Sequence, residues 1–487
     1  MVAFGLRLVA SLAVAGAVAH AAPQLAGIAG AVTHAAAPPE AVLGDAAPLL
    51  RTAASLPVVD MVNLASLRPP SEDPFYTVPD DVEEAAPGTI LRHRAPPNAI
   101  AGFGILPVRL QASHQILYRT TDSLGDATAT VLTVLIPYNA DLGKVLSYQV
   151  AEDAATIDCA PSYAFQFGHA TGPNHGTIVT EAELLLVEAA LEQGWVVIVP
   201  DFLGPKGAFL ANELAGQATL DGVRAAINSA SFTGIRKKPT VTMWGYSGGS
   251  LATLWAAELQ PTYAPELSIA GAAVGGTVPN IATTVKMVNK KESAGLIPAG
   301  ILGLANQYPE LDRLLDQHVL PQHRAGFYKP RSQCLMANLN QFANKDVTGM
   351  LDDPSLIFTH PLAVSVINRN RLGSSTPRMP IFVYKSTADE VSPVSETDAL
   401  VRQYCAAGAT VEYQRDAESD HGSLAVLAAP KALSWLRETM NDRRRKGCVT
   451  RTVTSSLLDP AALEFLPKIL IDALLILLGK RVGPIFG

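Results

Sequence analysis

Strongly apolar segments recur along most of this chain, and they are apolar throughout rather than alternating with polar residues. Examples are residues 130–136 (TVLTVLI), 195–200 (WVVIVP) and 381–385 (IFVYK). A strand with apolar side chains on both faces is typical of a sheet that is covered on both sides. Further strands of this kind are predicted at residues 145–150, 240–244, 268–274 and 410–414.

Segments with helical character separate these strands. Thr180 is a predicted N-cap for a helix that runs to about residue 193, with Glu183 as its capping-box partner and Gly194 at its end. The strict alternation of strand and helix predicts an α/β fold, in which helices cover both faces of a mostly parallel central sheet. Active sites of such sheets lie at the carboxyl ends of the strands. Other helices are expected near residues 220–228, 250–259, 394–407 and 424–440.

Three stretches depart from this alternation and suggest a division of the chain. Residues 22–71 are rich in Ala, Pro and Gly, which predicts a propeptide or a loose N-terminal arm. Residues 285–378 hold helical fragments and several prolines between two core strands, which predicts an inserted helical cap or lid. The core is then expected at residues 72–284 and 379–448, followed by a C-terminal tail or flap at residues 449–487.

The first residues have the pattern of a secretory signal peptide. Arg7 precedes an apolar run at residues 8–19, and the small residues Ala19 and Ala21 favour cleavage after Ala21. As a helix the apolar run would span about 18 Å, which is too short for a bilayer core of about 30 Å. We therefore predict a signal peptide at residues 1–21, a secreted, extracellular protein and no transmembrane span.

Composition excludes several classes of protein. Of the 487 residues, 48% are hydrophobic and 17% are charged, so the chain can bury a large core and is not disordered. The formal net charge is −7, from 37 Lys and Arg against 44 Asp and Glu. Because a nucleic-acid-binding protein needs a basic surface, no nucleic-acid partner is expected.

The four cysteines are too few for a disulfide scaffold, but an oxidising compartment favours disulfides. Three pairings are open. We prefer Cys159–Cys334 with Cys405–Cys448, since the nested and crossed pairings would each tie distant regions twice. No C-x-x-C pair occurs, so neither a metal site nor a redox motif is supported, and no cofactor is expected.

One motif carries specific chemistry. Gly245-Tyr246-Ser247-Gly248-Gly249 follows the predicted strand at 240–244 and precedes a predicted helix. This is G-x-S-x-G in the strand–turn–helix context of a nucleophile elbow, although a plain glycine-rich turn is the competing interpretation. The strained turn requires glycines, because side chains two residues before or after the serine would clash with neighbouring backbone. The motif therefore predicts Ser247 as a nucleophile.

A serine nucleophile needs a base that is oriented by an acid, and in this fold the chain order is Ser, acid, His. Of the histidines after Ser247, three lie inside the predicted cap, namely His318, His323 and His360. His421 instead lies in a loop between the strand at 410–414 and the last core helix, which is where the base of this fold belongs. We predict His421 as the base.

Asp389 follows the predicted strand at 381–385 and is the predicted acid, with Glu390 next to it and Asp398 on the following helix as rivals. The oxyanion hole needs two hydrogen-bond donors, and the Gly248 N–H is one by geometry. The other is expected from residues 151–153, and the motif alone does not select among them.

These residues resemble the fungal secretory lipases of the Candida antarctica lipase A type, over roughly residues 72–448. The most specific matches are Asp158-Cys159-Ala160-Pro161-Ser162-Tyr163 and the elbow at 245–249. Further matches are Asp73-Pro74-Phe75-Tyr76, Tyr118-Arg119-Thr120-Thr121, Ser147-Tyr148-Gln149, Leu220-Asp221-Gly222, Tyr263-Ala264-Pro265-Glu266-Leu267 and Gly275-Gly276-Thr277.

The resemblance implies an α/β-hydrolase fold with a helical cap, and the hydrolysis of triacylglycerols and other carboxylic esters. It implies Ser247 as nucleophile, Asp389 as acid and His421 as base, in agreement with the reading of the residues. It adds Asp153 as the second oxyanion donor beside Gly248. It also supports the preferred disulfide pairing.

Two regions depart from the family pattern. Residues 201–204 (DFLG) replace an Asp-His-Glu-Gly-like stretch, so that wall of the pocket is expected to differ. Residues 457–478 are unusually apolar but are interrupted by Lys468 and Asp472. A flap over the active-site entrance, an interfacial surface and a helix packed on the core are the three interpretations of this segment.

The sequence thus predicts a secreted serine lipase that forms an acyl-enzyme intermediate and takes a lipid or ester substrate at an oil–water interface. The alternatives are a carboxylesterase or polyester depolymerase with the same triad, a serine peptidase of the same fold and a non-catalytic binding protein. An intact set of Ser247, Asp389 and His421 argues against the last. The peptidase lacks support because no acidic motif for binding an N-terminal amine is found.

Overall fold

The computed structural model describes residues 67–169, 176–443, 445–462, 464–465, 472, 476 and 480–484. The predicted signal peptide, most of the predicted N-terminal arm and most of residues 457–478 lie outside this part of the chain. Of the predicted arm, Pro70 is buried, and Ser71 donates hydrogen bonds from N and Oγ to the Asp158 carboxylate, at 2.8 and 2.9 Å. The end of the arm is therefore attached to the core.

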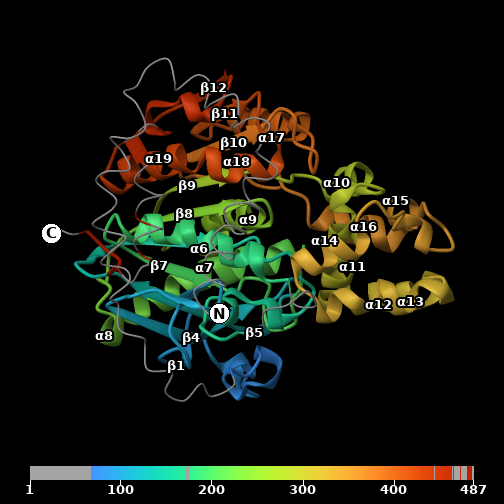
Figure 1. Ribbon diagram of the computed structural model, residues 1–487, viewed down its shortest axis with the longest axis horizontal. Coiled ribbons are helices and arrows are strands. Elements are labelled where there is room, and N and C mark those ends of the chain that lie inside the picture. The colour runs from blue at the N-terminus through green and yellow to red at the C-terminus, as the bar shows by residue number, and fades with distance from the viewer. Residues whose placement is uncertain are drawn as a thin grey trace, which may run out of the picture. The chain divides into compact units, whose positions relative to one another are not determined.

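A sheet of ten described strands forms the centre of the molecule (Figure 1). Its order is β1-β4-β5-β7-β6-β8-β9-β10-β11-β12, and neighbours from β7 to β12 are parallel, whereas β1, β4 and β5 are joined antiparallel. The predicted mostly parallel sheet is confirmed. The strands are β1 (Ile90–Arg94), β4 (Ala112–Thr121), β5 (Ala127–Ile136), β6 (Asp141–Gln149), β7 (Trp195–Pro200), β8 (Thr240–Tyr246), β9 (Ile269–Gly275), β10 (Ile381–Ser386), β11 (Val411–Asp416) and β12 (Cys448–Val453); β2 (Ala101–Gly102) and β3 (Leu106–Pro107) pair separately.

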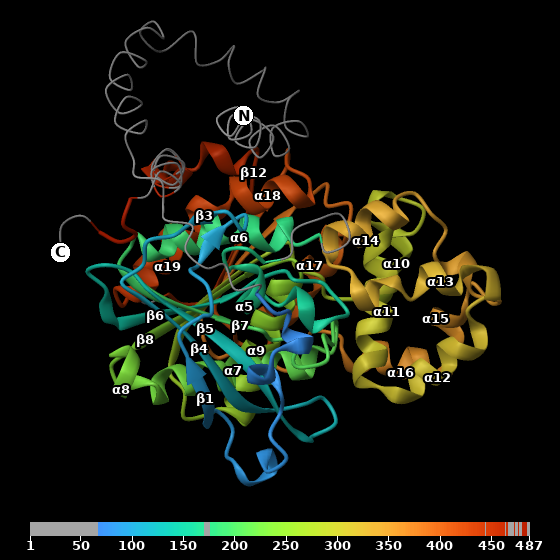
Figure 2. The same cartoon turned by 60° about the horizontal axis from the view of Figure 1, so that its bottom comes forward.

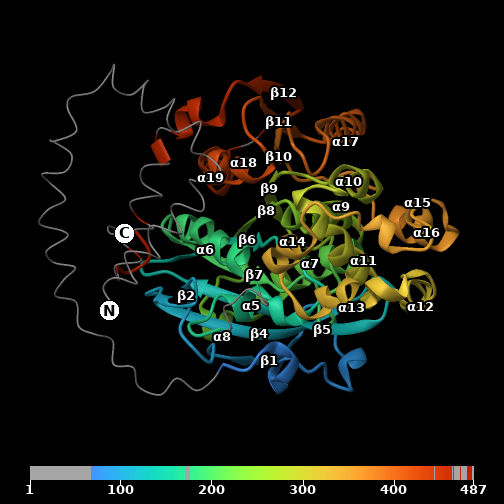
Figure 3. The same cartoon turned by 45° about the vertical axis from the view of Figure 1, so that its right-hand side comes forward.

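Helices cover both faces of this sheet, as the uniformly apolar strands predict (Figure 3). One face packs against α7 (Asn212–Asn228), α9 (Gly248–Tyr263) and α17 (Val394–Ala406), and the other against α6 (Ile178–Leu191), α18 (His421–Leu427) and α19 (Ala429–Met440). Each face of the sheet has its own apolar cluster, and β10 contributes side chains to both. Ile381 and Val383 belong to the cluster on the first face, and Phe382 and Tyr384 belong to the cluster on the second. Both faces of the sheet are thus buried.

A block of helices occupies the interval between β9 and β10, where the cap is predicted (Figure 2). We call residues 281–369 the helical cap; the domain limits predicted at 285 and 378 stay a prediction. The cap has its own apolar cluster, so its helices pack on one another as well as on the core. Its helices are α10 (Ile281–Val288), α11 (Leu296–Gln307), α12 (Pro309–His318), α13 (Arg324–Phe327), α14 (Leu335–Phe342), α15 (Leu356–Thr359) and α16 (Pro361–Arg369).

The four cysteines form the preferred pairs. The Cys159–Cys334 disulfide joins the short helix η4 (Ile157–Cys159) to the start of α14 in the cap. The Cys405–Cys448 disulfide joins α17 to the first residue of β12. A hydrogen bond from Asn306 Nδ2 to the Ala155 carbonyl, at 3.1 Å, is a further contact between cap and core.

Two local predictions are wrong, and the start of the predicted tail contains a strand. The helix predicted from Thr180 begins at Ile178, and Glu183 forms no capping box because its carboxylate accepts from Tyr148 Oη and Ala151 N, each at 2.8 Å. The helix predicted at 424–440 is two helices, α18 and α19, which meet at Ala428, just before Pro430. The predicted tail begins with a strand, β12, which extends the parallel sheet beyond β11.

Candidate active site

The nucleophile elbow lies at the carboxyl end of β8. Ser247 follows this strand directly and has a φ of 49°, a backbone conformation that non-glycine residues seldom adopt. Its N–H donates to the Gly275 carbonyl at the end of β9, at 2.9 Å, and α9 begins at the next residue. The strained turn thus raises the Ser247 side chain above the sheet edge, at the positive end of α9.

Two glycines make this turn possible. A Cβ atom on Gly245 would overlap the carbonyl group of Gly249, and a Cβ atom on Gly249 would overlap the carbonyl of Gln149 on β6. These clashes are the ones that the motif predicts. The two positions therefore need glycine for close approach of the backbone.

A continuous chain of hydrogen bonds runs from Ser247 to Asp389. His421 Nε2 lies 2.8 Å from Ser247 Oγ, and His421 Nδ1 lies 2.7 Å from Asp389 Oδ2. The three side chains come from the ends of β8 and β10 and from the start of α18. The structure therefore brings together the three residues that the sequence singles out, each within hydrogen-bond distance of the next.

Asp389 is held as a carboxylate. Its Oδ1 accepts from the N–H groups of Val391 and Ser392, at 2.9 and 2.8 Å, and its Oδ2 accepts from Lys385 Nζ at 2.7 Å as well as from His421. Burial raises the pKa of Asp389, but the nearby His421 and Lys385 outweigh it, so the net pKa lies below its usual value. The carboxylate thus stays negative over the range in which an imidazole titrates.

The backbone of His421 is held by neighbouring side chains. The Asp420 side chain caps α18 by accepting from the Ser423 N–H at 2.7 Å. Glu390 Oε2 accepts from the His421 N–H at 2.9 Å, and Tyr246 Oη donates to the His421 carbonyl. The imidazole is therefore positioned from three elements, and its side chain is 11% exposed toward the site.

Asp153 lies beside the nucleophile, in the loop after β6. Its φ is 45°, and a Cβ atom on Gly248 would overlap its Oδ1 atom. Burial raises the pKa of Asp153 to about 7, and the nearby His421 opposes the shift. The pKa of its neighbour Glu152 is also raised, first by burial and then by the charges of Asp201 and Asp153.

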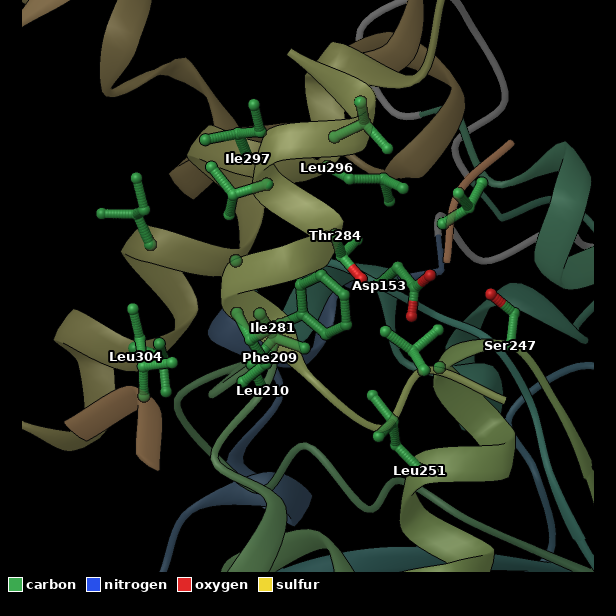
Figure 4. Close-up of a pocket in the computed structure, with 18 of the residues that line it drawn as sticks. Asp153, Phe209, Leu210, Ser247, Leu251, Ile281, Thr284, Leu296, Ile297 and Leu304 are labelled. Atoms are coloured by element: carbon green, nitrogen blue, oxygen red, sulfur yellow. The ribbon is translucent and has the colours of Figure 1, made fainter. Parts of the chain in front are cut away.

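An apolar cavity opens onto these groups (Figure 4). The Asp153 carboxyl group and the Ser247 hydroxyl group face the same end of it, and Thr284 is the other polar side chain in its lining. The rest of the lining comes from both the core and the cap, and includes Phe209, Leu210, Leu251, Val278, Ile281, Val285, Leu296, Ile297, Ile301 and Leu304. A second apolar cavity in the cap shares four residues of this lining, namely Ile301, Leu304, Ile357 and Ile367.

The expectation that residues 201–204 form a pocket wall is wrong. They do not line the cavity at Ser247. Asp201 instead accepts from Ser162 Oγ and N, at 2.5 and 3.0 Å, while Phe202 and Leu203 belong to a separate apolar cluster. Within the described ranges, no group of three or more His, Cys, Asp or Glu side chains could hold a metal ion.

Comparison with known proteins agrees with this geometry. A family model described as "Secretory lipase" matches residues 170–447. Lipase A of Arthroderma benhamiae is 48% identical over 419 residues, which cover 85% of this chain and 89% of that protein. The chain belongs to the secretory lipase family.

Other members of the secretory lipase family give the same picture. Lipase 5 of Candida albicans is 40% identical over 390 residues, covering 78% of this chain and 83% of its own length. The X-ray structure of Candida antarctica lipase A superposes with a TM-score of 0.74 at 28% identity, covering 86% of this chain and 99% of the other. The predicted family and α/β-hydrolase fold are therefore confirmed, and this secretory lipase is a hydrolase of carboxylic esters.

Asp398 and the cap histidines lie elsewhere in the secretory lipase, whereas Glu390 lies next to the site. Asp398 on α17 accepts from Tyr413 Oη at 2.9 Å and pairs with Arg415, and Glu390 contacts the His421 backbone rather than its ring. Of the cap histidines, His318 pairs with Asp352 at 2.9 Å. His360 is the N-cap residue of α16, and His323 closes the short helix η6 (Pro321–His323).

Sequence reasoning missed Lys385 and Glu390 as neighbours of the site. The sequence presents Glu390 only as a rival acid and Lys385 only as the last residue of a predicted strand. A lysine inside an otherwise apolar strand, four residues before the predicted acid, is the signal that could have pointed to Lys385.

Proposed function

We propose that this secretory lipase hydrolyses triacylglycerols and other carboxylic esters through an acyl-enzyme on Ser247. The observation that carries the proposal is the hydrogen-bonded chain from Ser247 through His421 to Asp389, at 2.8 and 2.7 Å, beside an apolar cavity. Of the polar side chains that line this cavity, Ser247 is the one within hydrogen-bond distance of His421. The cavity suits an acyl chain, because apart from Asp153, Ser247 and Thr284 its lining offers no polar side chain.

In the first half-reaction, His421 Nε2 takes the proton of Ser247 as Oγ attacks the ester carbonyl carbon. Asp389 keeps the imidazole in the tautomer with hydrogen on Nδ1 and stabilises the imidazolium that forms. The protonated His421 then gives its proton to the departing alcohol. In the second half-reaction, water attacks the acyl-enzyme by the same route and releases the acid.

The tetrahedral oxyanion needs donors beside Ser247. We assign the Gly248 N–H, the first of α9, and the Asp153 carboxyl group in its protonated form. The adjacency of Asp153 to Gly248 supports the pairing of these two donors. The pKa of Asp153, raised by burial to about 7, supports the presence of the proton that it would donate.

We also propose that the lipase is secreted after removal of residues 1–21 and acts at an oil–water interface. The two disulfides support an oxidising compartment. Exposed Val426 on α18 and Leu458 on the neighbouring η9 (Ser456–Leu458) support contact with lipid. In the part of the chain that the structure describes, no helix is both long and apolar enough to cross a bilayer.

The test is Ser247→Ala, assayed on a triacylglycerol emulsion and on p-nitrophenyl esters, with Ser355→Ala on the exposed cap surface as the matched control. We expect Ser247→Ala to lose activity by roughly 10⁴–10⁶-fold and to stop reacting with a fluorophosphonate probe. The control should keep both. Full activity of a folded Ser247→Ala would overturn the proposal, and turnover of short water-soluble esters alone would favour a carboxylesterase.

A further inference from the structure

Lys385 is a buried lysine at the carboxyl end of β10; burial lowers its pKa, and the neighbouring Asp389 carboxylate opposes that shift. Its side chain is 0% exposed, although lysine is seldom fully buried unless it is paired. Side chains alternate along a strand, so Lys385 lies on the same face as Ile381 and Val383, which belong to the apolar cluster that includes α17. A buried ammonium group there is unfavourable unless its partners compensate for lost hydration. Its partners therefore indicate what it does.

Two groups accept hydrogen bonds from Lys385 Nζ. One is Asp389 Oδ2 at 2.7 Å, and the other is the Thr277 carbonyl at 2.9 Å. The same Oδ2 atom accepts from His421 Nδ1 at 2.7 Å. A single carboxylate oxygen thus joins the buried ammonium group to the imidazole of the proposed triad.

The second partner connects Lys385 to the nucleophile. Thr277 comes directly after Gly275 and Gly276, and the Gly275 carbonyl accepts from the Ser247 N–H at 2.9 Å. Lys385 therefore ties the acid to the loop that also holds the backbone of the nucleophile. Because the Asp389 side chain is 0% exposed, water cannot take over this restraint if the ammonium group is removed.

The charge of Lys385 also affects the proton transfer from Ser247 to His421. When His421 takes the proton of Ser247, the imidazolium is attracted by Asp389 and repelled by Lys385. Without the lysine, the buried carboxylate would face the imidazole with its full charge and would hold a proton on it more tightly. The ammonium group therefore weakens the electrostatic attraction between Asp389 and the imidazolium that forms.

We propose that Lys385 is a positioning residue of the active site, which fixes Asp389 Oδ2 toward His421 and extends ester hydrolysis to lower pH. This inference rests on the proposed triad of Ser247, His421 and Asp389. Lys385 does not touch the substrate cavity and acts through Asp389.

The other charged groups nearby do not replace it. Arg415, its in-register neighbour on β11, is paired with Asp398 at 3.0 Å. Glu396 on α17 accepts from Thr283 Oγ1 at 3.0 Å. Among the described residues that contact His421, Glu390 accepts from its N–H and Tyr246 Oη donates to its carbonyl. Asp153 lines the adjoining cavity. Within the part of the chain that the structure describes, Lys385 is the only lysine or arginine that forms an ion pair with Asp389.

The experiment compares Lys385→Met, Lys385→Gln and Lys385→Arg with wild type, by kcat and KM on a p-nitrophenyl ester between pH 4 and pH 9. Methionine removes the charge at similar length, glutamine keeps a neutral donor, and arginine keeps the charge. Lys144→Met, on β6 at the opposite end of the sheet, is the matched control. Thermal unfolding of each variant shows whether it is folded.

We expect Lys385→Met to lose about 10-fold in kcat with KM unchanged, and to move the acid limb of kcat/KM upward by about one pH unit. Lys385→Gln should show the same shift with a smaller loss of kcat, so it decides the question if the methionine variant does not fold. Lys385→Arg should retain the acid limb of the wild type.

A folded Lys385→Met or Lys385→Gln with an unchanged acid limb would overturn the inference, whether or not kcat falls, because a purely structural role would not involve the charge. Failure of the underlying triad is distinguishable. In that case Ser247→Ala would keep its activity, whereas failure of the lysine inference alone would leave Ser247→Ala inactive.

Discussion

The Asp153 carboxyl group occupies the space that a side chain on Gly248 would fill. The carboxyl group and the first N–H of α9 are thereby neighbours at the nucleophile, although they come from different strands of the sheet. A carboxylic acid can serve as an oxyanion donor only while it is protonated. On the proposed assignment of Asp153 as an oxyanion donor, the environment of this side chain sets a limit on the pH range of catalysis.

The first prediction concerns the alkaline limb of the pH profile. Burial raises the pKa of Asp153 to about 7, so the carboxyl group is neutral and can donate below that pH. Above it, the carboxylate cannot donate and repels the oxyanion. The kcat of the wild type should therefore fall as the pH rises above about 7, whereas Asp153→Asn, which keeps an N–H donor at all pH values, should hold its kcat up to pH 9.

Asp153→Ala is the companion variant, since it removes the donor and should lower kcat by about 10²–10³-fold below pH 7, with a smaller difference at higher pH because the wild type then loses the donor as well. Steady-state kinetics from pH 5 to pH 9 on one soluble ester measure all three proteins. If Asp153→Asn and the wild type declined in parallel above pH 7, the assignment of the alkaline limb to Asp153 would be wrong.

The second prediction concerns acyl-chain length. Leu304 on α11 lines both the cavity at Ser247 and the second cavity of the cap, and Figure 4 shows it at the end remote from Ser247. Leu304→Trp should fill the passage between the two cavities. We expect a loss of about 10-fold or more in kcat/KM on esters of long acyl chains, with little change on butyrate esters.

The short-chain ester is the internal control for this variant, because it reports whether the catalytic groups are undisturbed. A uniform loss on every chain length would show that the tryptophan damages the cap instead of blocking an acyl path. Equal activity on every chain length would show that long acyl chains take another route.

The third prediction concerns stability. The Cys405–Cys448 disulfide closes a loop of 43 residues and holds β12 beside β11. In the chain-entropy model its removal destabilises the folded state by about 3–4 kcal/mol. Cys405→Ala combined with Cys448→Ala should therefore lower the free energy of unfolding by that amount, as measured by denaturant titration, while the kcat at 25 °C is retained. An unchanged denaturation midpoint would contradict this.

The sequence predicts best where burial alone decides the structure. Residues 195–200 are apolar at every position, and β7 has the bounds expected for them. The glycines of the elbow and the site residues at the ends of β8 and β10 are equally predictable from the sequence. Chain order and the positions of the strand ends restrict which side chains can contact one another. These constraints suffice to pick out Ser247, Asp389 and His421.

Other elements depend on partners that are distant in sequence. The strand β12 is largely exposed and carries polar side chains, so its place in the sheet comes from β11 and from the bond to Cys405. Glu183 has the spacing of a capping residue, yet its half-buried carboxylate accepts from Tyr148 and Ala151, which are donors that a local pattern cannot reveal. The same holds for Lys385, whose proposed role depends on its contact with Asp389 Oδ2, an atom that also contacts His421.

The Cys159–Cys334 disulfide has a consequence for the order of synthesis. Its two cysteines are separated by 175 positions, and Cys159 lies a few residues after Asp153. A chain made from its N-terminus must therefore be extended through most of the cap before this bond can form. The loop that carries Asp153 is among the earliest parts of the site to be translated, but it gains its covalent anchor only after α10 to α13 have been translated.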